Sequence, residues 1–280
     1  QTCALPISAS TTALEQQALR QVGPVTLPLK AVPALGETDA ARLNIRDLIV
    51  SASIPLVGSD PWTRALTERL IREVHGHLLM PGTTSSLLAA VGPALSQGES
   101  AGPATAIGSS SRATRLIAST LTQAIFWSGY TLEERHAPAT WTVRAGVPPQ
   151  GQPGLDAFID PEQRDDLRFA NNSDQPLLIQ AGVGNDQVIV NLYGTRPVWT
   201  VQIPEAQVRG VTAPDEGPDR REEAALQTGQ EFWIEDRSDG FTVSIQRTVS
   251  APGLEPGILT LTSTYQPARG ALLVAPASPR

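Results

Sequence analysis

The hydrophobic pattern of the chain changes near Thr140, and this change constrains the fold more than any other feature of the sequence. Before it, the segments Pro61 to Val74 and Arg112 to Ser128 place apolar residues at helical spacing. After it, short segments rich in β-branched and aromatic residues alternate with turns rich in Gly, Asn, Asp and Pro. Helices followed by strands predict an α+β fold, in which two main helices pack on an antiparallel β-sheet.

Capping and stop residues bound both expected helices. Ser59 and Asp60 are candidates to cap the first helix, and Gly76 is expected to end it. Gly129 is expected to end the second helix in the same way. The segment between the two helices, Pro93 to Ser111, is rich in Gly, Ser, Ala and Pro, so we expect a loop there.

The second half of the chain predicts an antiparallel meander. One apolar strand is also expected upstream at Leu48 to Ile54, and an edge strand at Val25 to Leu29, where Pro28 excludes a central place in a sheet. The stretch from Ala213 to Glu223 is expected to be an exposed linker. The downstream strands are expected at 141–144, 166–169, 177–183, 187–193, 198–203, 231–234, 241–249 and 257–265.

Composition excludes several classes of function. The net charge of -7 and the pI near 5.0 argue against a nucleic-acid partner, because a phosphate-binding face is basic. No window approaches the roughly 20 apolar residues of a membrane-spanning helix. The sequence contains neither a phosphate loop nor a dinucleotide fingerprint, so no cofactor is expected.

Residues 1–7 look like the translation of a sequencing-library adapter, and we interpret them as an artefact. Cys3 would then not be natural, and a signal or membrane anchor would lie in a missing N-terminal part. The alternative is that Cys3 carries a lipid after signal cleavage, but no lipobox precedes it.

Three short segments carry a family resemblance: Glu134-Arg135-His136, Gly154-Leu155-Asp156-Ala157 and Asp166-Leu167-Arg168-Phe169-Ala170-Asn171-Asn172. This series resembles the VanW family, named after an accessory gene of vancomycin resistance clusters. Family members carry E-R-H, G-x-D-A and D-L-[RK]-F-x-N-N segments, followed by a hairpin that ends near Y-G, as Tyr193-Gly194 does. The resemblance covers about Ile54 to Tyr193 and implies an exported protein of the bacterial cell envelope.

The resemblance also predicts a division of the chain. Residues 8–53 look like part of a peptidoglycan-binding domain that often precedes VanW regions, and residues 54–205 would form the VanW-like domain. Residues 206–275 would form a β-rich C-terminal region, and residues 276–280 a disordered tail.

One family segment is missing from this chain. The family usually has a run resembling G-G-G-[VI]-C-Q at the start of the helix that leads to E-R-H, and counting without gaps places Ser111 to Leu116 there. By this count, Arg115 stands at the position of the family's cysteine. A thiolate at a helix N-terminus near a histidine would be an activated nucleophile, whereas arginine is neither a nucleophile nor a proton shuttle. The sequence therefore favours a degenerate, non-catalytic site in a protein that contacts peptidoglycan or another wall component.

Two other interpretations remain open. A serine of Ser109 to Ser111 could act with His136 as base and Asp156 as its orienting residue, in a hydrolase or transferase acting on wall peptides. The alternative is that these residues have a structural role: His136 closes a helix-to-strand turn and Asp156 caps a turn. In the third interpretation, the chain is a structural subunit of an envelope assembly that pairs a sheet edge with a partner strand.

Aromatic and histidine residues give weaker candidates. Trp199 and Trp233 are expected on strands and are candidates to stack on a sugar, whereas the tryptophans on helices are expected in the core. His75 and His77 alternate, but no third ligand lies in register with them, so no metal site is expected.

Overall fold

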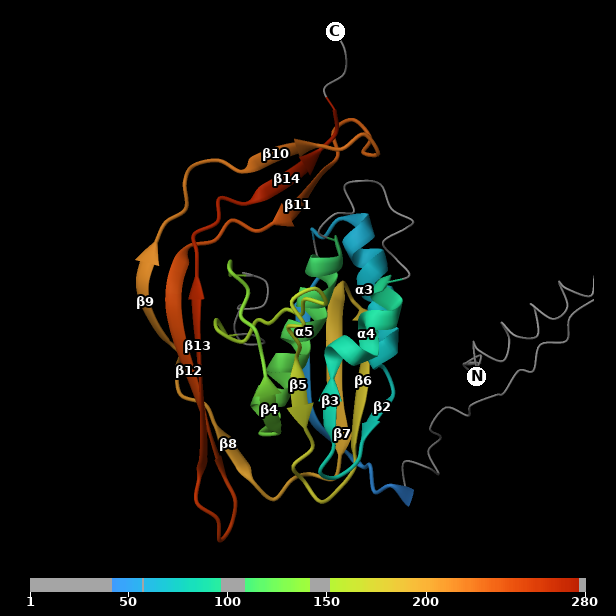
Figure 1. Ribbon diagram of the computed structural model, residues 1–280, viewed down its shortest axis with the longest axis vertical. Helices are drawn as coiled ribbons and strands as arrows, with labels where there is room; N and C mark the ends of the chain where they lie inside the picture. The colour runs from blue at the N-terminus through green and yellow to red at the C-terminus, as the bar shows by residue number, and fades with distance from the viewer. Residues whose placement is uncertain (1–41, 57, 97–108, 142–151, 277–280) are drawn as a thin grey trace, which may run out of the picture. The chain divides into compact units, whose positions relative to one another are not determined.

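The computed structural model describes residues 42–56, 58–96, 109–141 and 152–276, which are drawn as coloured ribbon in Figure 1. Several expectations therefore lie outside the described residues. They are the artefact at 1–7, the upstream segment up to residue 41 with its edge strand, most of the strand at 141–144, and the tail from residue 277.

The main sheet of the N-terminal half contains four antiparallel strands in the order β1-β7-β6-β2. Asn185 and Asp186 form the two-residue turn between β6 and β7, with φ angles of 51° and 56°. Asn and Asp tolerate this left-handed conformation, which hairpin turns require. The expected β6–β7 hairpin is thus confirmed. The strands are β1 Asp47–Pro55, β2 His77–Leu79, β6 Leu177–Gly184 and β7 Gln187–Gly194.

Strand β1 corrects the expected domain boundary. It pairs with β7 along its whole length, from Asp47 opposite Gly194 to Pro55 opposite Gln187. A boundary between residues 53 and 54 would cut through this strand, and the compact unit begins at Asn44. Pairing between segments so far apart in the chain leaves no local mark in the sequence, which explains the error.

Two helices confirm their sequence expectations. Helix α3 spans Pro61–Val74, and Asp60 caps it because its Oδ1 accepts the N–H of Thr63 at 2.9 Å. Helix α5 spans Ser109–Ser128 and begins slightly earlier than expected. The α+β prediction is therefore correct, with α3 and α5 as its main helices.

A third helix, α4 at Leu87–Ser96, was not expected. Pro93 lies inside it. Ser86 caps it, because its Oγ accepts the N–H of Ala89 at 2.9 Å, and Asp166 adds a second cap, because its Oδ1 accepts the N–H of Leu88 at 2.8 Å. The sequence pattern missed α4 because proline disfavours a helix interior and because Asp166 is distant in the chain.

A small antiparallel sheet, in the order β3-β5-β4, brings the family segments together. Its strands are β3 Thr84–Ser86, β4 Thr131–Glu134 and β5 Arg168–Ala170. Since β5 belongs to this sheet and not to the main one, the expected continuous meander is wrong at its first step.

The C-terminal region forms two further sheets, and both correct an expectation. Strand β8 leaves the main sheet and pairs with β12, as does β9, while β13 pairs with the other edge of β12. The expected linker contains β10, which lies parallel to β14 in the order β10-β14-β11. Strand β10 is charged throughout, so it shows no alternating pattern. The strands are β8 Thr200–Gln202, β9 Gln207–Thr212, β10 Asp219–Glu222, β11 Glu231–Glu235, β12 Gly240–Ser250, β13 Gly257–Tyr265 and β14 Ala271–Val274.

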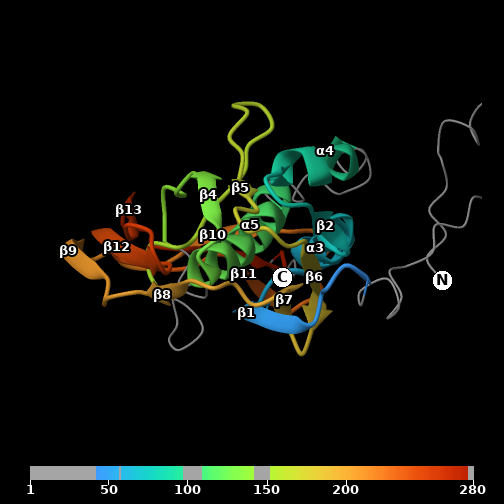
Figure 2. The same ribbon diagram turned by 90° about the horizontal axis from the view of Figure 1, so that it is seen from below.

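Helix α5 is buried between these parts of the fold (Figure 2). One side packs in the main core with β1 and β7. On another side, Phe126 forms a smaller cluster with Leu155 and with Ile245 of β12. The helix therefore joins the VanW-like part of the chain to the C-terminal sheets.

Candidate functional site

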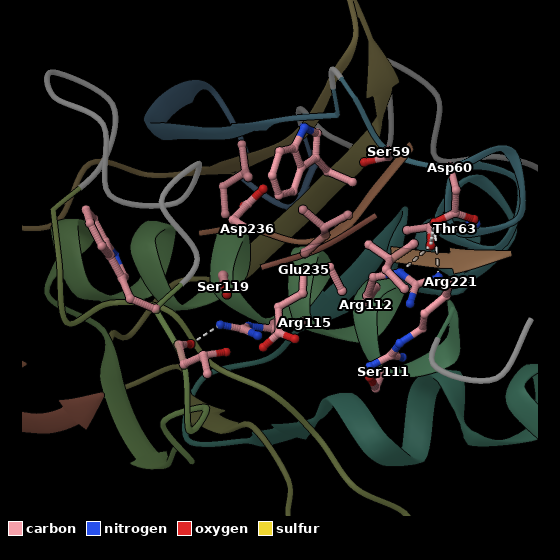
Figure 3. Close-up of a pocket in the computed structure, with 17 residues that line it drawn as sticks. Ser59, Asp60, Thr63, Ser111, Arg112, Arg115, Ser119, Arg221, Glu235 and Asp236 are labelled. Carbon is pink, nitrogen blue, oxygen red and sulfur yellow. Dashed lines mark hydrogen bonds and ion pairs between the residues drawn. The ribbon is translucent and has the colours of Figure 1, made fainter. Parts of the chain in front are cut away.

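A cavity of about 380 Å³ lies beside the N-terminal half of α5 (Figure 3). Its walls come from α5, from the start of α3, from the segment around Trp141, and from the β10-β14-β11 sheet. The charged residues that line it are Asp60, Arg112, Arg115, Arg221, Glu235 and Asp236.

Arg112 joins α5 to the start of α3. It donates from Nη2 to Oδ2 of Asp60 at 3.1 Å and from Nε to Oγ1 of Thr63 at 3.0 Å. Burial lowers the pKa of Arg112, Asp60 opposes this shift, and the nearby charge of Arg221 adds to it. Two guanidinium groups therefore lie close together at this end of the cavity.

Arg115 stands where counting along the sequence places the family cysteine. Its Nη2 donates to the carbonyl oxygen of Thr140 and lies 3.7 Å from Oδ2 of the buried Asp156. Burial lowers the pKa of Arg115, and Asp156 gives the largest opposing contribution. A paired cation thus occupies the position of the expected nucleophile.

Asp156 links the VanW-like segment to the C-terminal region. Its side chain accepts a hydrogen bond from the hydroxyl of Tyr265 on β13, and its backbone carbonyl accepts one from Nε of Arg135 at 3.0 Å. Burial and the negative charge of Asp156 raise the pKa of Tyr265, so this hydroxyl remains a donor at neutral pH. The carboxylate of Asp156 therefore connects the VanW-like segment to strand β13 of the C-terminal region.

His136 contacts a different pair of carboxylates. Its Nε2 lies 2.9 Å from Oε1 of Glu134, and its Nδ1 lies 3.5 Å from Oδ1 of Asp165. These are the polar partners of its ring in the part of the chain that the structure describes. The structure therefore does not bring His136 together with Asp156 or with Ser111, and the expected serine, histidine and aspartate arrangement is not assembled.

The remaining motif residues contact the backbone. Asn171 is buried and donates from Nδ2 to the carbonyls of Leu79 at 3.0 Å and Gln175 at 2.8 Å. Asn172 accepts the N–H of Thr131 at 3.2 Å, and Phe169 is buried in the main core. These contacts hold the turns of the two sheets together.

Glu134 and Asp166 also contact the backbone, because each carboxylate accepts a backbone N–H. Oε1 of Glu134 accepts the N–H of Asp166 at 3.0 Å, and Asp166 caps α4. The hydrogen bond from His136 and then that from the Asp166 backbone lower the pKa of Glu134. In this chain the family segments therefore build the scaffold beside the cavity.

The tryptophans proposed as sugar platforms lie in different places. Trp233 lines the cavity and is 38% exposed, so part of it is open to a ligand. Trp199 lines a separate depression, where its Nε1 donates to the carbonyl of Ser128 at 2.9 Å and its ring meets Tyr130 edge-on at 5.5 Å. Trp199 is thus held by structural contacts.

Four charged residues of the cavity were not candidates in the sequence interpretation: Arg112, Arg221, Glu235 and Asp236. Two arginines in the first turns of a helix were the available indication, because the helix dipole disfavours cations at that end. Trp141 packs edge-on against Phe241 with ring centroids 5.2 Å apart. No sequence pattern indicated that contact.

Within the described segments, no group of three His, Cys, Asp or Glu side chains could hold a metal ion. The helices of those segments are also too short or too polar to cross a membrane.

The fold and the site define an α+β protein in which a buried helix lies beside a charged cavity. Residues 67–193 match the VanW like protein family, and this part of the chain belongs to that family. The family is associated with vancomycin resistance and with the cell envelope.

Other comparisons add little. A solved structure described as "Crystal structure of HP0197-G5" is similar over 28% of this chain and 97% of its own, at 16% identity and a TM-score of 0.13. That score is too low to support any conclusion. None of the curated proteins compared with this chain matches it.

Proposed function

We propose that this protein is a non-catalytic, exported binding protein of the bacterial cell envelope, which contacts peptidoglycan or another wall component through the cavity beside α5. The observation that carries the proposal is the ion pair of Arg115 with Asp156 at the place of the expected family cysteine. The association of the family with the cell envelope supports the location.

Binding is favoured over catalysis by the chemistry of the groups present. A guanidinium remains protonated at neutral pH and cannot attack a carbonyl or transfer a proton. The ring of His136 is engaged by Glu134 and Asp165, and His136 does not line the cavity. The hydrolase alternative therefore lacks the histidine base that it requires.

A wall component suits the cavity chemically. Cell-wall polymers carry carboxylates on their peptides and flat faces on their sugars. Guanidinium groups recognise carboxylates, and an exposed indole offers a face for stacking. Arg221 and Trp233 place both kinds of group at this cavity.

The direct test is co-sedimentation of the full chain with purified insoluble peptidoglycan over a salt series. We expect saturable binding near physiological salt that weakens in the Trp233→Ala variant. Leu254→Ala is the matched control, because Leu254 is exposed but lines the other depression. The proposal fails if the chain stays in solution while a protein of established wall affinity sediments under the same conditions.

A further inference from the structure

The cavity beside α5 carries opposite charges at its two ends. Figure 3 shows Arg221 and Ser111 near Asp60 at one end, and Asp236 toward Ser119 at the other. Arg221 lies close enough to Arg112 to affect its pKa, whereas Glu235 and Asp236 act in this way on Arg115. The separation of charge is therefore built into the walls.

Arg221 and Glu235 form no ion pair or side-chain hydrogen bond within the described residues, although the charge of Glu235 acts on Arg115. Their strand neighbours Arg220 and Glu231 form an ion pair with each other away from the cavity. The fold thus satisfies one pair of charges and leaves the other at the cavity wall.

The sheet keeps Arg221 and Glu235 apart. Strand β14 lies between β10 and β11, so two strand spacings, roughly 10 Å, separate the strands that carry them. An extended peptide covers that distance with about three residues. A cavity of about 380 Å³ falls within the size range of small-ligand sites.

We infer that this cavity binds a short peptide with a free carboxylate and a free ammonium group, the carboxylate at Arg221 and the ammonium at Glu235. The inference rests on the proposed function and narrows it, because the peptides of the wall polymer carry both groups and its glycan does not. Trp233 also lines this cavity.

Calorimetry with the full chain tests the inference, using trialanine with both termini free. Trialanine amide and N-acetyl-trialanine remove one charge each, and chitotetraose represents the neutral glycan. We expect trialanine to bind and each blocked peptide to bind about tenfold more weakly. Equal binding of the blocked peptides, or tighter binding of chitotetraose, would overturn the inference.

Two variants assign the ends of the ligand. Arg221→Gln should weaken trialanine binding about tenfold and remove the effect of C-terminal amidation. Glu235→Gln should do the same for N-terminal acetylation. Arg220→Gln and Glu231→Gln are the matched controls, because they remove the same charges from the same strands outside the cavity. Equal losses in the controls would mean that only net charge matters, and would contradict the assignment.

The calorimetry and the wall-binding test can give different outcomes. If the protein sediments with peptidoglycan but does not bind trialanine, the proposed function stands and the peptide inference is wrong. If the protein binds trialanine but does not sediment with peptidoglycan, the peptide site is supported and the proposed wall contact is wrong.

Discussion

The two ends of α5 are contacted by arginine in opposite ways. At the C-terminal end, Nη1 of Arg247 from β12 donates to the carbonyls of Ile125 at 2.7 Å and Phe126 at 2.9 Å, and Nη2 donates to the carbonyl of Tyr130. These carbonyls lie at the end of the helix, where the negative end of the helix dipole favours a cation; the carbonyl of Ile125 also accepts from Oγ of Ser128 at 3.2 Å. Arg247 thus binds the helix end without a carboxylate.

At the N-terminal end the arginines belong to the helix itself. The dipole disfavours cations there, and Arg112 and Arg115 are each paired with a buried carboxylate, Asp60 and Asp156. Arg247 stabilises the C-terminal end of α5. Arg112 and Arg115 are unfavourable at the N-terminal end unless a carboxylate neutralises each of them. Local conflicts of this kind are typical of functional sites.

The largest effect is expected at the C-terminal end. Arg247→Ala should lower the free energy of unfolding by about 3 kcal/mol, because it removes the charged donor of three carbonyls at the helix end. Urea denaturation measures the loss. Arg209→Ala, an exposed arginine on β9, should change stability by less than about 0.5 kcal/mol. A loss below about 1 kcal/mol for Arg247→Ala would refute the role of Arg247 as a helix-end clamp.

The next effect lies at the N-terminal end. Asp156→Asn should lower the free energy of unfolding by about 2 kcal/mol, because Arg115 keeps its charge and loses its compensation. Asp186→Asn is the control, since the Arg64–Asp186 pair at 2.9 Å is exposed and should contribute less than about 0.5 kcal/mol. Equal losses in thermal unfolding would show that the burial of Asp156 is irrelevant.

Tyr265→Phe is expected to cost about 1 kcal/mol at neutral pH, because Asp156 loses a donor. The pKa of Tyr265 is raised in the folded chain, so its contribution is complete below its ordinary pKa of 10.0. It declines as the pH rises above that value, because the unfolded chain ionises first. Stability measured from pH 8 upward should therefore fall more steeply in the wild type than in Tyr265→Phe, and parallel curves would exclude this linkage.

The smallest effect on stability is expected when both members of the Arg115–Asp156 pair are replaced. Arg115→Gln combined with Asp156→Asn should remain within about 1 kcal/mol of the wild type, because removing both charges avoids an unpaired one. The same double variant should lose wall binding in the sedimentation assay. If wall binding persisted, the Arg115–Asp156 pair would be structural only.

Local signals predicted much of the scaffold. The cap at Asp60, the stops near Gly76 and Gly129 and the Asn185-Asp186 turn all act within a few residues, so α3, the end of α5 and the β6–β7 hairpin were predictable. Helix α4 was not, because Pro93 lies inside it and part of its capping comes from Asp166, in another segment of the chain.

The candidate site was predictable only in part. The sequence comparison indicated that Arg115 replaces the family cysteine, and Trp233 was expected as a candidate platform. Arg221 was hidden in a segment whose charges suggested a linker, although it forms β10.

The sequence by itself determined where α3 and α5 form and where the β6–β7 hairpin turns. Capping, turn geometry and periodicity are properties of neighbouring residues, so they are present in the chain before it folds. Only the tertiary structure decided that Asp156 faces Arg115 and Tyr265, away from His136. Ion pairs and hydrogen bonds between distant segments depend on sheet order and register, and these follow from packing across the whole core.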